Sequence, residues 1–273
     1  MNCLEDFHQD ILGKAMRGLG IGKNDMAHRI GTEREEIEGI LKGAFDESYI
    51  RQMASELSID ANKLIRSARR EWLPAPVGIE GVIQFNSSYH DMAVNAYLTW
   101  DDRTKEAWIF DTGTEAYPIV SFVAQNNLKV KAIFLTHTHL DHIACLQELR
   151  QKTGQPLVFV HHLELFAGCE PIDEGFQDEL GSLSLETRHT HGHSVGGITY
   201  FLNGLTKPIA FVGDAVFAGS MGGGMVSYGD ALRTNREKIM TLPNETILCP
   251  GHGPMTTVME EKKHNPFFPE FKT

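Results

Sequence analysis

Thr136-His137-Thr138-His139-Leu140-Asp141-His142 is the stretch that decides how this chain is interpreted, and it follows the apolar run KAIFL. It holds four side chains that can bind a metal within six residues. Histidines two apart in an extended segment can turn to the same side, so His137 and His139 can bind one ion. Asp141 and His142 begin the next turn and can serve a second ion. Imidazole suits zinc and iron, and a carboxylate adds a harder oxygen ligand.

Three later segments add residues of the same kind after apolar runs. They are THGHS at 190–194, with His193; FVGDA at 211–215, with Asp214; and CPGHGP at 249–254, with His252. Each of these residues stands beside a glycine, where the backbone can turn and approach a neighbour closely. A single aspartate after a strand is more often a turn or cap residue. The three segments in this order, together with the first stretch, predict one metal centre.

The chain around these segments alternates between short apolar runs and longer amphipathic ones. The longer segments predict helices near 115–126, 140–152 and 230–241. Strands mixed with helices in this way favour an α/β layered fold. The short runs predict strands near 81–85, 93–98, 107–110, 132–135, 157–160, 197–202, 209–212 and 246–248.

The part of the chain before residue 74 has a helical pattern and no strand signal. Thr32 with Glu35 predicts a capping box at the start of one helix. Asp46 and Asp60 can each cap a further helix, and we expect about five short helices in all. The stretch WLPAPVG, at 72–78, has two prolines and a glycine and predicts a linker. We therefore divide the chain into an all-α domain at 1–73 and a larger domain at 74–273.

Composition restricts the classes of function. The chain has 273 residues and a formal net charge of −11, which disfavours nucleic-acid binding because phosphate affinity depends on lysine and arginine. Its four cysteines have no paired spacing, so neither a disulfide framework nor a zinc ribbon is indicated. No apolar run reaches about 18 residues, and no basic segment followed by an apolar one opens the chain. We expect a cytoplasmic protein without a membrane partner.

Residues 78 to 268 resemble the metallo-β-lactamase fold superfamily, because HTHLDH, THGHS, GDAVF and PGHG match its metal-binding motifs in order. The resemblance implies a four-layered αββα sandwich with the metals at one edge. It also implies that Asp111, in IFDTG, supports the ligands without binding metal itself. Two divalent ions are implied, with zinc preferred and iron or manganese as alternatives. One ion would take His137, His139 and His193; the other would take Asp141, His142 and His252; and Asp214 would bridge them.

Within the superfamily the chain is similar to glyoxalase II-type hydrolases. Its ending, GPMTTVMEEKKHNPFF, is similar to the short-tailed bacterial branch of that group, and only 21 residues follow His252. The C-terminal helical domain that supplies much of the glutathione contact is therefore missing from this sequence. The likeness implies a thioesterase of the hydroxyacylglutathione hydrolase type, in which a metal-bridging hydroxide attacks a small acyl or thioester substrate. Asp141 and Asp214 would be its catalytic residues, placing the ions and orienting the nucleophile.

Two other enzymes are compatible with the same ligands. A lactonase would use all seven, and only a panel of substrates separates it from a thioesterase. A persulfide dioxygenase would share the fold and use one iron. Its relatives usually have an alanine and an aspartate around the last histidine, whereas this chain has Gly251-His252-Gly253.

Several features near the predicted centre have weaker signals. The segment GSMGGG, at 219–224, predicts a mobile loop near the site. His161 and His162 follow a strand and are expected at its edge. His189 and His191 flank the His193 segment and are expected to support it, not to bind metal.

Residues 10 to 70 resemble the helix-turn-helix fold of repressor-type regulators, with helices at 24–30 and 32–42. The second helix carries four glutamates, which would repel phosphates. We therefore expect the helices to pack, to form a homodimer interface or to cover the substrate. The alternative is a DNA-binding regulator with a metal-binding sensor domain. The charged residues of the second helix are Glu33, Glu35, Glu36 and Glu38, against Arg34 and Lys42.

Overall fold

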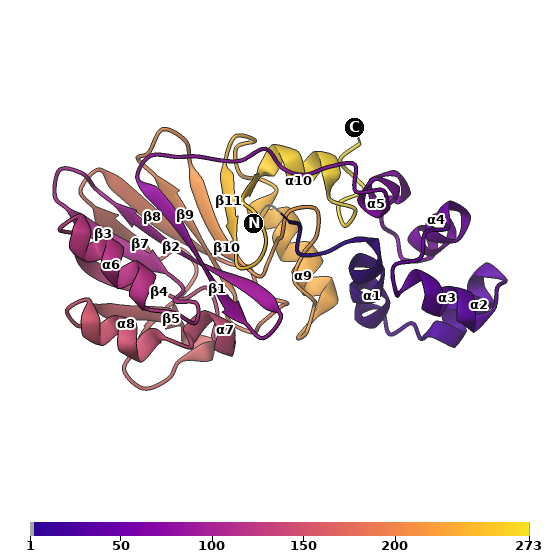
Figure 1. Ribbon diagram of the computed structural model, residues 1–273, viewed down its shortest axis with the longest axis horizontal. Helices are drawn as coiled ribbons and strands as arrows, with labels where there is room; N and C mark the ends of the chain where they lie inside the picture. The colour runs from indigo at the N-terminus through magenta and orange to yellow at the C-terminus, as the bar shows by residue number, and fades with distance from the viewer. Residues whose placement is uncertain (1–2, 273) are drawn as a thin grey trace.

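The computed structural model describes residues 3–272 as two stacked β-sheets with outer helices, preceded by five short helices (Figure 1). The five helices confirm the helical start of the chain. Among residues 3–272, no helix combines the length and the apolar character needed to cross a bilayer. The five helices are α1 (His8–Gly18), α2 (Lys23–Ile30), α3 (Arg34–Ile40), α4 (Glu47–Glu56) and α5 (Ala61–Ala68).

Each of the two sheets has six strands. The first has the order β1-β2-β3-β4-β5-β6, antiparallel up to β3 and parallel from β3 onward. The second has the order β12-β11-β10-β9-β8-β7, in which only β10 and β11 are parallel. The first sheet contains β1 (Val82–Tyr89), β2 (Met92–Trp100), β3 (Glu106–Phe110), β4 (Lys129–Phe134), β5 (Leu157–His161) and β6 (Glu170–Ile172). The second contains β7 (Gln177–Leu180), β8 (Leu183–His189), β9 (Ile198–Asn203), β10 (Ile209–Gly213), β11 (Ile247–Pro250) and β12 (Thr256–Thr257).

The inner faces of the two sheets meet in an aromatic core. Phe110 of β3 stacks on Phe211 of β10 with ring centroids 3.7 Å apart, and Tyr200 of β9 packs on both Phe110 and Phe134. Aromatic pairs of this kind contribute about 0.5–1.5 kcal/mol beyond the area they bury. Because β3, β4 and β10 are clamped at this core, the residues that follow them are held at one edge of the sandwich.

Helices cover the outer faces of both sheets and complete four layers. The apolar sides of α6 (Tyr117–Gln125) and α8 (Leu146–Lys152) pack on the first sheet. The short α7 (Leu140–Ile143) lies between them in the sequence. The second sheet is covered by α9 (Tyr228–Thr234), the π-helical turn at Asn235–Ile239 and α10 (Val258–His264). This arrangement is the predicted four-layered αββα sandwich.

The first five helices share their apolar core with the sandwich. Buried side chains of α1–α5 pack against Met221, Tyr228, Ala231 and Phe267, which come from the glycine-rich loop, from α9 and from the end of the chain. Polar contacts reinforce this packing. The Lys63 ammonium donates to the carbonyls of Lys262 and Phe268, both at 2.8 Å. The division at residue 73 stays a prediction, but the apolar core does not stop there.

The helix caps and strands agree with the sequence patterns in part. Asp46 and Asp60 accept hydrogen bonds from Tyr49 N and Lys63 N and confirm both predicted caps. The capping box at Thr32 is wrong, because α3 begins at Arg34 after Glu33 and has no side-chain cap. Four strands, β6, β7, β8 and β12, were not predicted. Three of them have two to four residues, which is too short for a periodic signal.

Candidate metal centre

The predicted ligands lie where strands of both sheets end. The segment after β4 has His137 and His139, and α7 then presents Asp141 and His142. The segment after β8 has His193. Asp214 follows β10, and His252 comes two residues after β11. The structure therefore brings all seven predicted residues to one edge of the sandwich.

Three histidines form the first group of ligands. One ring nitrogen from each of His137, His139 and His193 lies within 4.8 Å of the others. His193 Nε2 is 3.0 Å from His139 Nδ1. His137 is buried, whereas His139 is exposed, so the group opens to solvent on the His139 side.

Asp141, His142 and His252 form the second group, with ligand atoms again within 4.8 Å. His252 Nε2 is 3.2 Å from Asp141 Oδ2, and His142 Nε2 is 3.5 Å from the same oxygen. All three side chains are buried. The second group therefore lies deeper than the first.

Asp214 lies between the two groups. Its Oδ2 is 3.3 Å from His193 Nε2 and 3.5 Å from His252 Nε2, and its Oδ1 is 3.3 Å from His142 Nε2. One carboxylate thus faces histidines that belong to both groups. This is the position in which a bridging ligand would stand.

Hydrogen bonds behind the histidines fix which nitrogen faces the site. His252 Nδ1 donates to the carbonyl of Ala93 at 2.7 Å, and His193 Nδ1 donates to that of Gly223 at 2.9 Å. Since a carbonyl only accepts, Nδ1 has the proton in both rings and Nε2 presents a lone pair to the site. This is the tautomer that a metal ion requires.

Asp111 orients the histidine loop without entering the site. Its Oδ1 accepts from Thr136 N at 2.7 Å, and its Oδ2 accepts from Thr136 Oγ1 and from His142 Nδ1, both at 2.8 Å. The Thr136 hydroxyl proton is used on Asp111, so Oγ1 accepts from His137 Nδ1 at 3.0 Å. One carboxylate therefore sets the ring direction of His142 and, through Thr136, that of His137, as the resemblance predicted.

Three buried atoms at the centre have no hydrogen-bond partner within residues 3–272. They are His137 Nε2, His142 Nε2 and Asp214 Oδ1. An unpartnered buried polar atom costs about 1–3 kcal/mol, and more when it is charged. All three face one another at the sheet edge, and a divalent cation would satisfy all three. The residues present therefore fit a metal ion.

The charges at the centre favour a cation. Burial would raise the pKa of Asp214, yet the facing His252 and His142 hold it well below its ordinary value, so the carboxylate stays ionised. Burial lowers the pKa of His142, but Asp111 and Asp214 outweigh it and raise the pKa to about 10. The carboxylates thus create a potential that attracts positive charge. A metal ion would supply that charge in place of the protons on the histidine rings.

Two glycines allow the backbone to approach the ligands. A Cβ on Gly251 would lie 2.2 Å from Asp214 Oδ1 and 2.5 Å from His142 Cε1. A Cβ on Gly222, in the glycine-rich loop, would lie 2.0 Å from the Asp214 carbonyl oxygen. Any side chain at either position would displace Asp214. The glycine-rich loop is therefore packed against the centre through its backbone.

Sequence reasoning missed two residues that hold the ligand loops. Glu164 accepts from Thr138 N and from Gly196 N, at 2.7 and 2.8 Å, and so ties the first histidine loop to the His193 loop. Asn95 donates from Nδ2 to the carbonyl of Pro250 at 2.9 Å, and its backbone N–H donates to that of Gly251. Thus Asn95 holds the loop that presents His252. Neither residue lies in a motif, because each acts through contacts distant in sequence.

Four further histidines form a cluster outside the centre. His161 stacks on His189 with ring centroids 4.1 Å apart, and His189 lies 4.4 Å from His191. His161 and His162 each face Asp173, at 3.3 and 3.2 Å. His162 is exposed just after β5, as predicted, whereas His161 is buried at the end of that strand.

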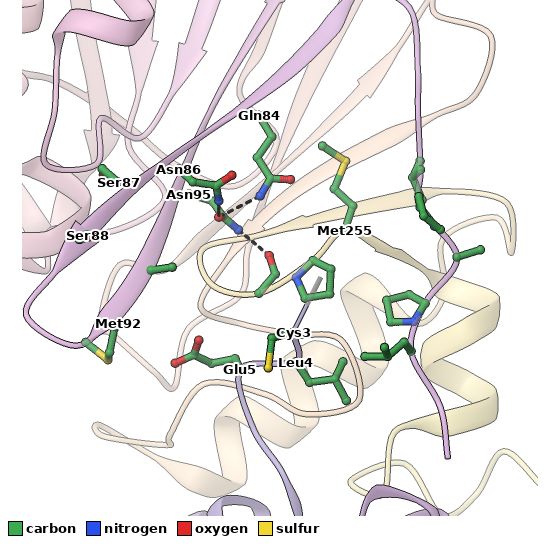
Figure 2. A pocket seen from close by; sticks show the side chains of 18 of the residues that line it. Cys3, Leu4, Glu5, Gln84, Asn86, Ser87, Ser88, Met92, Asn95 and Met255 are labelled. Carbon is green, nitrogen blue, oxygen red and sulfur yellow. Dashed lines mark hydrogen bonds between the residues drawn. The ribbon is translucent and has the colours of Figure 1, made fainter. Parts of the chain in front are cut away.

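A cavity of about 720 Å³ is lined by Glu5, Met92 and Asn95, among other residues (Figure 2). Ala93, whose carbonyl holds the His252 ring, lines it, and so does Gly253, the residue after His252. Cavities that bind small molecules commonly have about 300–1,000 Å³. The cavity is therefore large enough for a small molecule, and it reaches the ligand groups through the two residues that adjoin His252.

Comparison with known proteins agrees with this geometry. The chain matches the sequence model of the metallo-beta-lactamase superfamily over residues 91–252, and it belongs to that superfamily. It is a superfamily hydrolase whose fold binds divalent metal. Helices α1–α5 lie before the matched residues.

Two curated relatives cover most of their own length. One is a probable metallo-hydrolase, YqgX of Bacillus subtilis, 33% identical over 65% of this chain and 93% of its own. Another is the hydroxyacylglutathione hydrolase GloC of Haemophilus influenzae, 30% identical over 63% of this chain and 92% of its own.

Solved structures show the same fold. ETHE1 from Myxococcus xanthus superposes with a TM-score of 0.61 and 26% identity, over 69% of this chain and 85% of its own. TTHA1623, crystallised in a di-iron-bound form, superposes with a TM-score of 0.55 and 25% identity, over 67% of this chain and 99% of its own.

Proposed function

We propose that this chain is a dinuclear hydrolase of a small thioester, with zinc as the preferred metal. The supporting observation is the Asp214 carboxylate, which lies within 3.5 Å of three histidines drawn from both ligand groups. A single ion at the first group would leave Asp141, His142 and His252, whose ligand atoms also converge within 4.8 Å, without a metal to bind. The di-iron form of one structural neighbour supports two ions and makes iron the alternative metal.

The protein's own residues have defined roles in this proposal. A divalent ion held here supplies Lewis acidity and a water that ionises near neutral pH. Burial would raise the pKa of Asp141, but the hydrogen bond from His252 and the His142 charge lower it, so Asp141 is ionised like Asp214. These carboxylates orient the attacking water and hold its proton while its oxygen adds to the thioester carbonyl carbon. The carbon–sulfur bond then breaks, the proton passes to the thiolate, and the products are a carboxylic acid and a thiol.

The helices α1–α5 serve this enzyme as a cover in our proposal. They pack on the segment between Met221 and Ala231, the same segment that includes the carbonyl bound by His193. The α3 helix argues against a DNA-binding role, because Glu35 and Glu36 are exposed on it and Glu33 is exposed just before it. We also propose a cytoplasmic location, where the four free cysteines would stay reduced.

The test combines metal analysis with a substrate panel. The full chain, purified without added metal, is assayed by mass spectrometry for zinc, iron and manganese. It is then stripped, reloaded with each metal and tested on thioesters, lactones and a persulfide with oxygen monitored. We expect about two ions per chain and thioester turnover well above lactone turnover.

Two results would overturn the proposal. Lactone hydrolysis far above that of every thioester would make the chain a lactonase. One iron per chain with oxygen uptake on the persulfide would make it a dioxygenase.

A further inference from the structure

Several distant parts of the chain, including the linker at 73–77, form the cavity beside His252. The β1–β2 hairpin forms one wall, and the loop after β11 forms the floor near Gly253. Another wall is the segment before α1, including Glu5 (Figure 2). Glu5 is held against the floor, because a Cβ on Gly253 would lie 3.3 Å from its backbone nitrogen.

The position of Glu5 is fixed by its neighbour. Asp6 is buried, accepts a hydrogen bond from Ser220 Oγ at 2.6 Å and forms an ion pair with Lys14. Lys14 also donates to the carbonyl of Met221 at 2.9 Å. The glycine-rich loop therefore anchors the segment that brings Glu5 to the cavity.

The amides on the hairpin wall present acceptors to the cavity. Asn95 Nδ2 donates to the carbonyls of Pro250 and Gly253, both at 2.9 Å, and a carbonyl cannot donate in return. Asn95 Oδ1 must then face Gln84 and Asn86, which donate to it from their amide nitrogens at 2.9 and 2.6 Å. Gln84 Oε1 and Asn86 Oδ1 are left as acceptors, and the structure shows no partner for either among residues 3–272.

The charged residues of the cavity all have one sign. Glu5 is half-buried at the wall, and Asp91 and Glu115 are exposed at the rim. The described lining has no lysine, arginine or histidine. A cavity with three carboxyl groups and unpartnered amide oxygens favours a ligand that is positively charged or rich in donors.

We propose that this cavity binds the cationic end of the substrate, so that the chain prefers thioesters bearing an ammonium group to anionic thioesters such as those of glutathione. Glutathione has two carboxylates and one ammonium, and its net negative charge would meet Glu5, Asp91 and Glu115. Glu5 is the specificity-determining residue, since it is the least exposed carboxyl of the three. This inference rests on the proposed thioester hydrolysis.

The test separates binding from turnover. Two thioethers that cannot be hydrolysed serve as binding probes, one with a trimethylammonium end and one with a carboxylate end of equal length. Calorimetry on the metal-loaded full chain measures both, in the wild type, in Glu5→Gln and in Glu179→Gln. Glu179 is an exposed carboxyl on β7 outside the cavity, so its variant controls for net charge.

We expect the wild type and Glu179→Gln to bind the ammonium probe at least about tenfold more tightly than the carboxylate probe. Glu5→Gln should reduce that preference about fivefold, in line with one partly exposed ion pair. Equal affinity for the two probes, or a preference that Glu5→Gln leaves unchanged, would overturn the inference.

Turnover of acetylthiocholine and of an acetyl thioester of 3-mercaptopropionate then tests the function separately. Comparing the ratio of their kcat/KM values between wild type and Glu5→Gln cancels the intrinsic reactivity of the two thiols. Charge-selective binding without turnover of either ester would leave the cavity assignment standing and refute the thioesterase. Turnover without selective binding would support the thioesterase and refute the cavity assignment.

Discussion

The metal centre and the contact between α1–α5 and the sandwich are both buried and polar, yet their charged groups are paired in different ways. At the centre, His137 Nε2, His142 Nε2 and Asp214 Oδ1 have no partner in the described chain. At the helical contact the Lys63 ammonium binds two carbonyls, and Glu261 of α10 accepts from three donors within the sandwich itself. Tyr228 Oη at the helical contact is also unpaired, so the centre is distinguished by the convergence of His137, His142 and Asp214 within 4.8 Å.

The glycine-rich loop joins these two regions. Gly223 accepts from His193 on the metal side, while Ser220 and Met221 are bound by Asp6 and Lys14 on the helical side. Gly219 N donates to Glu261 at 2.9 Å. A loop with four glycines is thus held at several points, and a disturbance on either side can reach the other.

The largest effect is expected from Asp214→Ala, which removes the carboxylate shared by both ligand groups. Metal content should fall for both ions, and turnover should drop by several orders of magnitude without unfolding. His252→Ala should lower the content from about two ions towards one, as measured by mass spectrometry beside thioester turnover. His162→Ala, in the separate histidine cluster, is the control and should keep both ions. Unchanged metal content in Asp214→Ala would contradict a shared ligand.

Deletion of residues 1–72 should damage the fold. It would expose Met221, Tyr228, Ala231 and Phe267, which are buried against the helices. We expect the shortened chain to aggregate or to change its oligomeric state in size-exclusion chromatography with light scattering. A monomeric, fully active product would show instead that α1–α5 form an independent unit on a linker.

Lys63→Met should destabilise the helical contact. It leaves the carbonyls of Lys262 and Phe268 without their donor, at roughly 2 kcal/mol each or about 4 kcal/mol in total. Urea unfolding measures the loss. Lys23→Met changes an exposed lysine that pairs only with Glu38 and should stay within about 0.5 kcal/mol of the wild type. An equal loss of unfolding free energy in the two variants would show that the buried Lys63 contact stabilises the fold no more than an exposed ion pair does.

Glu261 should make the stability of the folded chain depend on pH. Burial raises its pKa to about 7 from the ordinary 4.5, so the folded state binds this proton more tightly than the unfolded state does. Its contribution is then fully present below about pH 4.5 and is lost as the pH rises through 7, by about 3 kcal/mol at 1.36 kcal/mol per pKa unit. Glu261→Gln should remove that slope in unfolding measured from pH 4.5 to 8. A slope identical in both proteins would assign it to other groups.

The smallest effect is the one expected on DNA. Fluorescence anisotropy with random duplexes at physiological salt should show no binding, because the exposed glutamates of α3 repel phosphates. Submicromolar binding that weakens steeply with salt would revive the regulator interpretation.

The sequence alone pointed to the candidate metal ligands and determined the class of fold. HTHLDH, THGHS, GDAVF and PGHG are local signals, since each ligand stands directly after a strand or beside a glycine. The resemblance also pointed to Asp111, which likewise stands directly after a strand. Residues that directly follow strands lie close together wherever those strands end at the same edge of a sandwich.

Only the tertiary structure decided how the helices, the cavity and the supporting residues are arranged. No spacing in the sequence predicts the roles of Asn95, Glu164 and Glu261, because their partners are far away in the chain. WLPAPVG suggested a boundary, yet the apolar core crosses it because Met221 and Phe267 complete the packing of α1–α5. Glu5 reaches the cavity for the same reason: its position depends on contacts of Asp6 with residues more than 200 positions later. Local patterns specify the elements and their ligands, whereas packing between distant surfaces specifies what surrounds them.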